Sequence, residues 1–432
     1  MGAEIALTET AEFKRAAVRG LSFAVGFFFS FRLCIVLLST RLLGIEPSTG
    51  SALTFSLDLI LFGLVCFDST GANQRTLGSM LQLPAVRWVL LFLAFSGASL
   101  LWTESASLLN SIAYWFGLVV DVGSVLLILR SGSAIDDCYS MLKGFIWSSC
   151  FLALIAWMMP VASDLRLGDE QFFPTNEIAN TCAFAIFFAQ YLTRQDQGKW
   201  SFAKFFLVVT LVRSLSKATL VAFLVSESLL LIMDRSMRRR TKVVLLTSAI
   251  VLIFAFWGLF EAYYDVYTTA GNQAETFTGR TAIWLYALAG VTARPWNLWI
   301  GHGFDSWWKV VPPFGSEMFE ARHAENELLQ QLYAYGAVGV VLLAGIYGSL
   351  YRQLRKLQLC PTRVLFLSLL TYIMVRGLAE AGPFDLLLPL WSIIVISLLI
   401  EQARTSQQEA SEIQAHHPSS RAENSQNPSV IC

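Results

Sequence analysis

The chain has 432 residues, of which 55% are hydrophobic and only 14% charged, and its formal net charge is zero at pH 7. A soluble protein of this length rarely carries so apolar a sequence, and a net charge of zero provides no bulk field that would attract nucleic acid. The apolar residues stand in long unbroken blocks, many near the length that crosses a bilayer core as a helix. We therefore predict an all-α polytopic integral membrane protein.

Block length predicts about twelve transmembrane helices. Their expected limits are Ala17–Thr40, Ser51–Phe67, Val86–Trp102, Leu109–Leu129, Met141–Val161, Ile178–Leu192, Phe202–Leu211, Ala218–Met233, Val243–Phe260, Leu328–Tyr351, Val364–Leu378 and Pro383–Ile400. The sixth to eighth are the least regular of these blocks, because the seventh is short and the eighth follows closely behind it.

Lysine and arginine collect in loops that fall on one side if every block crosses the membrane once. The strongest run lies between Arg235 and Lys242, and other basic residues precede the first span and follow the second and the tenth. Because such residues stay in the cytoplasm, we predict that both termini are cytoplasmic. The chain then divides into a cytoplasmic N-terminus (1–16), the first nine spans (17–260), a long periplasmic loop (261–327), three further spans (328–400) and a disordered cytoplasmic tail (401–432).

The periplasmic loop 261–327 carries net negative charge and five tryptophans, at positions 284, 296, 299, 307 and 308. Tryptophan favours the boundary between membrane and water, so the loop is expected to lie along the outer surface. Within it, Thr281–Ala293 is expected to form a helix lying flat on that surface.

His323 lies at the end of this loop, in a polar stretch just ahead of an apolar block. On a helix, His323, Asn326 and Glu327 would share one face, and His323 would lie near the positive end of the helix dipole. That position disfavours imidazolium and leaves a neutral ring able to accept a proton from a hydroxyl. The alternative is that His323 merely caps a helix at the water boundary, and the residues alone leave both readings open.

Several cations fall on the predicted outer face. Arg280 follows Gly279, and a planar guanidinium can bind a phosphate through two parallel hydrogen bonds. Arg213 and Lys217 flank the junction of the seventh and eighth spans, and Arg376 lies at the outer end of the eleventh. Together they favour an anion-binding pocket.

Two of these cations could instead have a purely structural role. Arg280 could simply reach for lipid headgroups, and Arg376 could form a helical ion pair with Glu380 four residues later. His302, between two glycines, is expected to be a solvated turn residue. The spans also contain Arg32 and Asp121, whose role the sequence does not indicate.

The sequence contains no pattern for a metal or a nucleotide cofactor, so neither is predicted. The seven cysteines are scattered and form no pair with zinc-ligand spacing. There is no Walker P-loop and no HExxH, and His323-Ala-Glu325 lacks the PCxxC partner of the zinc deaminases. Ser214 and Ser216 have no G-x-S-x-G context.

Three stretches stand in a recognisable order: TGRTAIW (278–284), GHGF (301–304) and HAENELLQQLYAYGAVGVVLL (323–343). This order resembles the Wzy-C region of the O-antigen ligase and polymerase superfamily. LWTES (101–105) and SLSKATLVAF (214–223) are also similar to landmarks of that family. The family usually has arginine where Lys217 stands here, and lysine supplies charge without the bidentate fork.

The resemblance implies a membrane-embedded, GT-C type, metal-independent inverting glycosyltransferase of a bacterial inner membrane. Its donor would be a glycan on undecaprenyl diphosphate, and its acceptor a sugar hydroxyl of lipid A-core or of a growing polysaccharide. Arg280 would hold the diphosphate, with Arg213 and Lys217, and His323 would activate or position the hydroxyl. Gly279, Asn326, Glu327, Arg376 and Glu380 would support them.

The sequence suggests three candidate functions. The first is a ligase of lipopolysaccharide biosynthesis, and the second is a polymerase of O-antigen or exopolysaccharide repeat units. The third, from a different class, is a polysaccharide or lipid transporter, which would predict two similar halves. No such halves are found in the sequence, whereas nothing in it separates the ligase from the polymerase.

Overall fold

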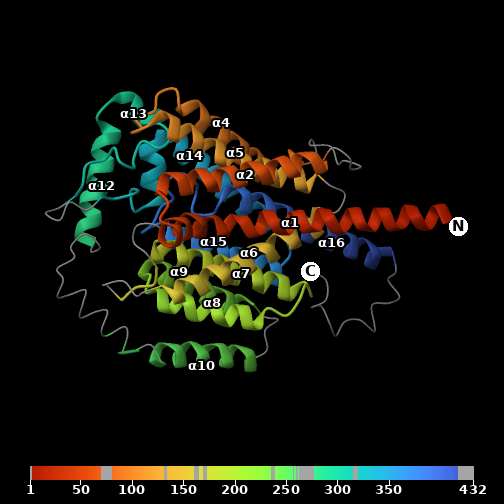
Figure 1. Ribbon diagram of the computed structural model, residues 1–432. Coiled ribbons are helices and arrows are strands. Elements are labelled where there is room, and N and C mark those ends of the chain that lie inside the picture. The colour runs from red at the N-terminus through yellow and green to blue at the C-terminus, as the bar shows by residue number, and fades with distance from the viewer. Residues whose placement is uncertain are drawn as a thin grey trace. The chain divides into compact units, whose positions relative to one another are not determined.

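Figure 1 shows the computed structural model of the chain. It describes residues 2–69, 80–130, 134–159, 165–168, 173–234, 239–255, 257–258, 261, 277–314 and 320–416. The chain forms two compact units. The first unit comprises Met1–Ser79 and Val120–Thr219, and the second comprises Met80–Val119 and Leu220–Cys432.

Within the described ranges the secondary structure is helical, with no β-strand, which confirms the all-α prediction. The helices are α1 (Gly2–Leu43), α2 (Pro47–Ser69), α4 (Pro84–Ser99), α5 (Leu108–Leu129), α6 (Ala134–Met158), α7 (Thr175–Arg194), α8 (Ser201–Ser214), α9 (Lys217–Met233), α10 (Arg239–Ala255), α12 (Phe277–Thr292), α13 (Pro295–Ile300), α14 (Glu327–Lys356), α15 (Pro361–Arg376) and α16 (Leu390–His416).

Each predicted span overlaps one of these helices. By length and composition, five helices of the described chain are apolar and long enough to cross a membrane: Arg19–Arg41, Pro47–Asp68, Leu108–Leu129, Ala134–Met158 and Glu327–Lys356. Pro84–Ser99 is a shorter apolar helix. The described part of the chain is thus all-helical and consistent with a multi-pass membrane protein. The count of twelve crossings and the sidedness of the loops stay predictions.

Polar contacts join the helices of the first unit. Arg32 on α1 places Nη1 2.6 Å from Oδ2 of Asp121 on α5, so the two intramembrane charges of unknown role form an ion pair. Ser22 on α1 donates a hydrogen bond of 2.9 Å to Asp137 on α6. Such contacts between apolar helices lower the cost of polar groups in a membrane and fix how the helices pack.

In the second unit, α4, α12, α13, α15 and α16 all pack against α14 (Figure 1). Helix α14 is interrupted at Gly336, where φ is 62° and ψ is −155°. A Cβ at Gly336 would meet the backbone of Trp299 at the end of α13. A Cβ at Gly301 would meet the backbone of Ala334. Glycine at these two positions therefore allows α13 and the kink of α14 to touch backbone to backbone.

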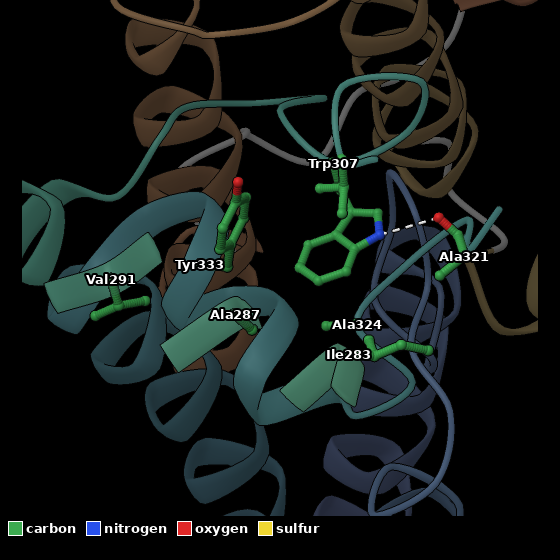
Figure 2. Packing of buried hydrophobic residues seen from close by; sticks show 8 residues of the cluster. Ile283, Ala287, Val291, Trp307, Ala321, Ala324 and Tyr333 are labelled. Atoms are coloured by element: carbon green, nitrogen blue, oxygen red, sulfur yellow. Dashed lines mark hydrogen bonds between the residues drawn. The ribbon is translucent and has the colours of Figure 1, made fainter. Parts of the chain in front are cut away.

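A buried apolar core holds the loop ahead of α14 in place. Figure 2 shows α12 contributing Ile283, Ala287 and Val291, and Tyr333 of α14 facing Trp307. The indole Nε1 of Trp307 donates a hydrogen bond of 3.0 Å to the carbonyl oxygen of Ala321. Ala324 completes this core with no exposed surface. The residues on either side of His323 are thus anchored by apolar packing, which fixes the position of the histidine between them.

Three expectations about the loop and the tail can be compared with these helices. The predicted helix over Thr281–Ala293 is confirmed by α12, and its orientation to the membrane stays a prediction. The tryptophans of the loop differ in solvent exposure: Trp296 and Trp299 are more than half exposed, whereas Trp307 is buried in the core. The predicted disorder from residue 401 is wrong for its first part, since α16 continues to His416; residues 417–432 lie outside the described residues.

Candidate active site

Five ionisable residues of the second unit form one group, here called the His323 cluster: His323, Glu325, Arg280, Arg376 and Glu380. His323 and Glu325 come from the stretch before α14, and Arg280 from the first turn of α12. Arg376 is the last residue of α15, and Glu380 follows in the loop that leads to α16. Segments separated by up to 100 positions therefore supply one site.

The start of α14 fixes the stretch that carries His323. Asn326 is the N-cap, with an extended backbone, and its Oδ1 accepts a hydrogen bond of 3.0 Å from the Leu329 amide. Its Nδ2 donates a hydrogen bond of 3.1 Å to the carbonyl oxygen of Leu378. An N-cap satisfies an amide that the helix leaves unpaired. Asn326 thereby also ties the loop of Glu380 to the start of α14.

His323 is not on the helix, so the predicted shared helical face with Asn326 and Glu327 is wrong. The reason is the cap, because α14 begins only at Glu327 and Asn326 has non-helical backbone. Glu325, between them, has φ of 51°, a left-handed conformation that residues other than glycine rarely adopt. This turn folds the chain back before the helix and brings the Glu325 side chain to the imidazole.

The hydrogen bonds of His323 define which ring nitrogen carries its proton. The backbone amide of Glu325 donates to Nδ1 at 3.2 Å, so Nδ1 must be unprotonated. The neutral ring then carries its proton on Nε2, which lies 3.9 Å from Oε2 of Glu380. The proton of His323 thus faces the one cluster carboxylate that is almost fully buried, with a side-chain exposure of 3%.

Burial governs the protonation of this pair. Burial lowers the pKa of His323, and Arg376, Arg280 and Arg322 lower it further against the opposing effect of Glu380. Burial also raises the pKa of Glu380, and so does the nearby Glu325, whereas Arg376 and His323 lower it. Both shifts favour the neutral form of each side chain in this buried site.

Arg280 contacts the cluster through Glu325, with Nη2 3.4 Å from Oε2. Its side chain keeps 22% exposure, which leaves part of the guanidinium open to solvent. Gly279 precedes it within α12, so both residues lie in the helix rather than in a loop before it.

Glu327 has a structural role beside the cluster. Its Oε1 accepts hydrogen bonds of 2.8 Å from both the Tyr347 hydroxyl and the Leu387 amide. Its own amide donates to the carbonyl oxygen of Gly377 at 2.9 Å. Glu327 therefore fastens both ends of the loop that carries Glu380 to α14.

Arg376 and Glu380 are both buried, at 4% and 2% exposure. Because α15 ends at Arg376, Glu380 lies outside the helix and the two residues do not share a helical face. The charge of Arg376 nevertheless lowers the pKa of Glu380, so a structural ion pair between them stays a prediction. After the turn over residues 377–379, Oε2 of Glu380 lies 3.9 Å from Nε2 of His323.

The two remaining predicted cations belong to the first unit. Arg213, in the last turn of α8, donates a hydrogen bond of 2.7 Å from Nη1 to the carbonyl oxygen of Leu165. Leu215, with φ of 60°, ends that helix, and Lys217 begins α9. Between them, Ser216 donates to Asn176 at 2.7 Å. Participation of Arg213 and Lys217 in the same site as His323 stays a prediction.

The expectation for His302 is wrong, because its side chain is buried. The ring stacks on Tyr333 with centroids 4.2 Å apart and is fixed by hydrogen bonds to Asn297 and to the carbonyl oxygen of Tyr333. LWTES holds the same turn, since the amide of Glu104 donates to the carbonyl oxygen of His302 at 3.0 Å. Both motifs thus build the scaffold of the second unit, a role that their spacing in the sequence did not indicate.

One group of side chains in the described chain has the makings of a metal site: ligand atoms of His323, Glu325 and Glu380 lie within 4.8 Å of one another. Arg280 contacts Glu325, and the charge of Arg376 acts on both other members. Two guanidinium groups so close would repel a divalent cation.

Comparison with known protein families gives one match. Residues 202–344 match the profile of the family described as O-Antigen ligase, Wzy_C. The match covers about a third of the chain and confirms the resemblance to the O-antigen ligase superfamily. Arg280 and His323 lie inside the matched region, whereas Arg376 and Glu380 lie beyond it. No curated protein matches the chain.

Proposed function

We propose that this protein is an O-antigen ligase-like glycosyltransferase that acts on the periplasmic face of a bacterial inner membrane. It transfers a glycan from undecaprenyl diphosphate to a sugar hydroxyl of lipid A-core or a similar acceptor. The observation that carries the proposal is the pairing of His323 with buried Glu380 beside Arg280, at the end of a Wzy-C domain.

In the proposed reaction the acceptor hydroxyl lies against both Nε2 of His323 and Oε2 of Glu380. Atoms 3.9 Å apart can each make a hydrogen bond to one oxygen placed beside the line between them. The hydroxyl accepts a hydrogen bond from Nε2–H and gives its proton to the Glu380 carboxylate. His323 therefore positions the hydroxyl, and Glu380 is the general base.

The hydroxyl oxygen attacks the anomeric carbon of the donor as the proton leaves. The bond from that carbon to the diphosphate oxygen breaks, and its electron pair departs with the diphosphate. Attack opposite the leaving group inverts the anomeric centre. Arg280 balances the charge that develops on the diphosphate, which is the main electrostatic contribution to the rate. The lipid diphosphate is already an activated leaving group, so the reaction uses no cofactor.

The test is transfer by purified protein supplied with a lipid-linked oligosaccharide and an acceptor. Arg280→Ala and His323→Ala are each expected to lower the rate about 10²-fold, the usual effect of removing one charge-stabilising or positioning group. Arg294→Ala is the matched control, because Arg294 is an exposed arginine of the same segment that pairs only loosely with Glu104, at 3.4 Å. Transfer by both cluster variants at the parent rate would refute the mechanism.

The polymerase function uses the same chemistry with a different acceptor. A deletion strain separates the two functions. Full-length polymer left on undecaprenyl diphosphate indicates a ligase, whereas single repeat units in place of long chains indicate a polymerase.

A further inference from the structure

Beside the His323 cluster, three aromatic side chains from separate segments of the second unit come together without being fully buried: Tyr114 of α5, Trp308, and Phe384 in the loop before α16. Tyr114 stacks on Phe384 with ring centroids 4.3 Å apart, and Trp308 lies at a tilt, 6.1 Å from Phe384. Beneath them, Phe304 and Trp307 are buried and belong to the interior. The three outer rings therefore keep open surface where the core beneath is closed.

Polar groups stand at the rim of this aromatic surface. Asp305 accepts a hydrogen bond of 2.8 Å on Oδ2 from Ser111, and among the described residues its Oδ1 has no hydrogen-bond partner. Burial raises the pKa of Asp305 to about 6, so the side chain is a carboxylate at neutral pH. Lys309 and Arg322 place their charges 5.3 Å and 5.6 Å from the centroid of the Trp308 ring.

The turn that presents these groups is strained. Asp305 and Lys309 have φ of 58° and 60°, although neither is a glycine. Folded proteins tolerate such strain mostly where the geometry serves a site. Asp305 and Trp308 therefore belong to one strained turn.

We propose that Tyr114, Trp308, Phe384 and Asp305 form a subsite for one pyranose ring of the acceptor glycan. The apolar C–H face of a pyranose packs on aromatic rings, and its hydroxyls require charged or polar partners at the rim. A carboxylate with one oxygen already fixed by Ser111 is rigid and can accept a hydrogen bond from a sugar hydroxyl through the other. This inference rests on the proposed transferase function.

The subsite adjoins the residues that handle the acceptor hydroxyl. Arg322, over Trp308, is the residue before His323, and Phe384 lies four positions after Glu380 in one loop. A sugar ring held on the aromatic surface would therefore present a hydroxyl toward His323 and Glu380. The diphosphate-binding role falls to Arg280, on the Glu325 side of the cluster.

The first experiment measures transfer with the full-length protein while acceptor and donor concentrations are varied separately. Trp308→Leu and Phe384→Leu are expected to raise the acceptor KM at least tenfold, with the donor KM unchanged and kcat within about threefold. Trp308→Phe, which keeps a ring, should recover most of the acceptor affinity. Trp296→Leu is the matched control, as an exposed tryptophan of the same segment. An acceptor KM that stays at the parent value in both leucine variants overturns the subsite.

The second experiment needs no transfer, so that failure of the subsite and failure of the proposed function can be told apart. Saturation-transfer NMR on the detergent-solubilised protein uses two probes, delipidated core oligosaccharide and a single soluble O-antigen repeat unit. Binding of either probe that is lost in Trp308→Leu and weakened in Asp305→Asn supports the subsite, even if the protein transfers no sugar. Binding of neither probe to the parent, or equal binding to parent and both variants, overturns it. Asp305→Asn is nearly isosteric and serves if a leucine variant does not fold.

Discussion

The tautomer of His323 determines which side chain of the cluster can accept a proton. A histidine acting as base must present an unprotonated nitrogen, yet Nδ1 is occupied by the Glu325 amide and Nε2 carries the proton. The sequence suggested a base at position 323, whereas the proposed mechanism gives that role to the carboxylate that the ring faces. The distinction leads to a test based on pH.

Glu380→Gln is expected to lower kcat/KM by about 10²–10⁴-fold, because the amide cannot accept the proton. In the parent, kcat/KM should fall as the pH drops through the pKa of Glu380, since only the ionised carboxylate is active. Burial raises that pKa, so the acid limb should lie above the ordinary glutamate value of 4.5. The measurement is a pH–rate profile at low acceptor concentration.

The same profile in His323→Gln separates the two candidate bases. Residual activity that keeps the acid limb identifies Glu380 as the base. Loss of the limb in His323→Gln, together with its persistence in Glu380→Gln, would assign the base to His323 instead.

Removal of divalent metal is expected to leave the rate unchanged, although His323, Glu325 and Glu380 could ligate an ion by their spacing. The adjacent guanidinium groups oppose such binding. The measurement compares the purified protein before and after dialysis against EDTA. A tenfold loss that Mg²⁺ or Mn²⁺ restores would show that the cluster holds a metal ion.

At the scale of elements, the kink of α14 joins two motifs that the sequence presents separately, GHGF and YGAVGVV. Gly301, just after α13, lies against the backbone of Ala334, and Gly336 in α14 lies against the backbone of Trp299; both glycines have positive φ. Both were visible in the sequence, but these contacts depend on how α13 folds back, which no spacing rule indicates.

Gly336→Ala is expected to destabilise the protein by about 2 kcal/mol or more, because the methyl group meets the backbone of Trp299 and the left-handed φ is strained for alanine. Gly348→Ala on the same helix is the matched control, since a Cβ there meets nothing within 4 Å. Thermal unfolding in detergent measures both. Equal Tm values for the two variants would contradict the assigned role of the kink.

The sequence predicted the helices well but the arrangement of the His323 cluster only in part. Long apolar blocks can be recognised directly in the sequence, and every span predicted from them overlaps a helix. His323, Arg280 and Glu380 could be chosen as polar residues in an apolar chain. The sequence did not show that Asn326 caps α14 and excludes His323 from it, because a cap differs from a first turn only in backbone angles. It also misassigned His302, whose burial results from stacking on the distant Tyr333.

At the scale of the whole molecule, the predicted sidedness can be tested by labelling. In a variant whose native cysteines are replaced, Trp296→Cys should react with a membrane-impermeant maleimide in intact spheroplasts. Arg355→Cys, also exposed, should react only after the membrane is opened. These outcomes follow if the loop before α14 is periplasmic and the loop after it cytoplasmic. Labelling of Arg355→Cys in intact spheroplasts would overturn the topology.

The break at Gly336 also divides α14 into two segments of different length. The segment after it, 337–356, contains about the 20 residues that cover a 30 Å hydrocarbon layer, whereas the segment before it, 327–335, adds roughly 13 Å at 1.5 Å per residue. A span formed by the longer segment would raise the His323 cluster above the lipid tails, into the headgroup layer. At that height a lipid-borne diphosphate can remain anchored by its chain while a water-soluble sugar chain approaches from outside, so neither substrate has to leave its own medium.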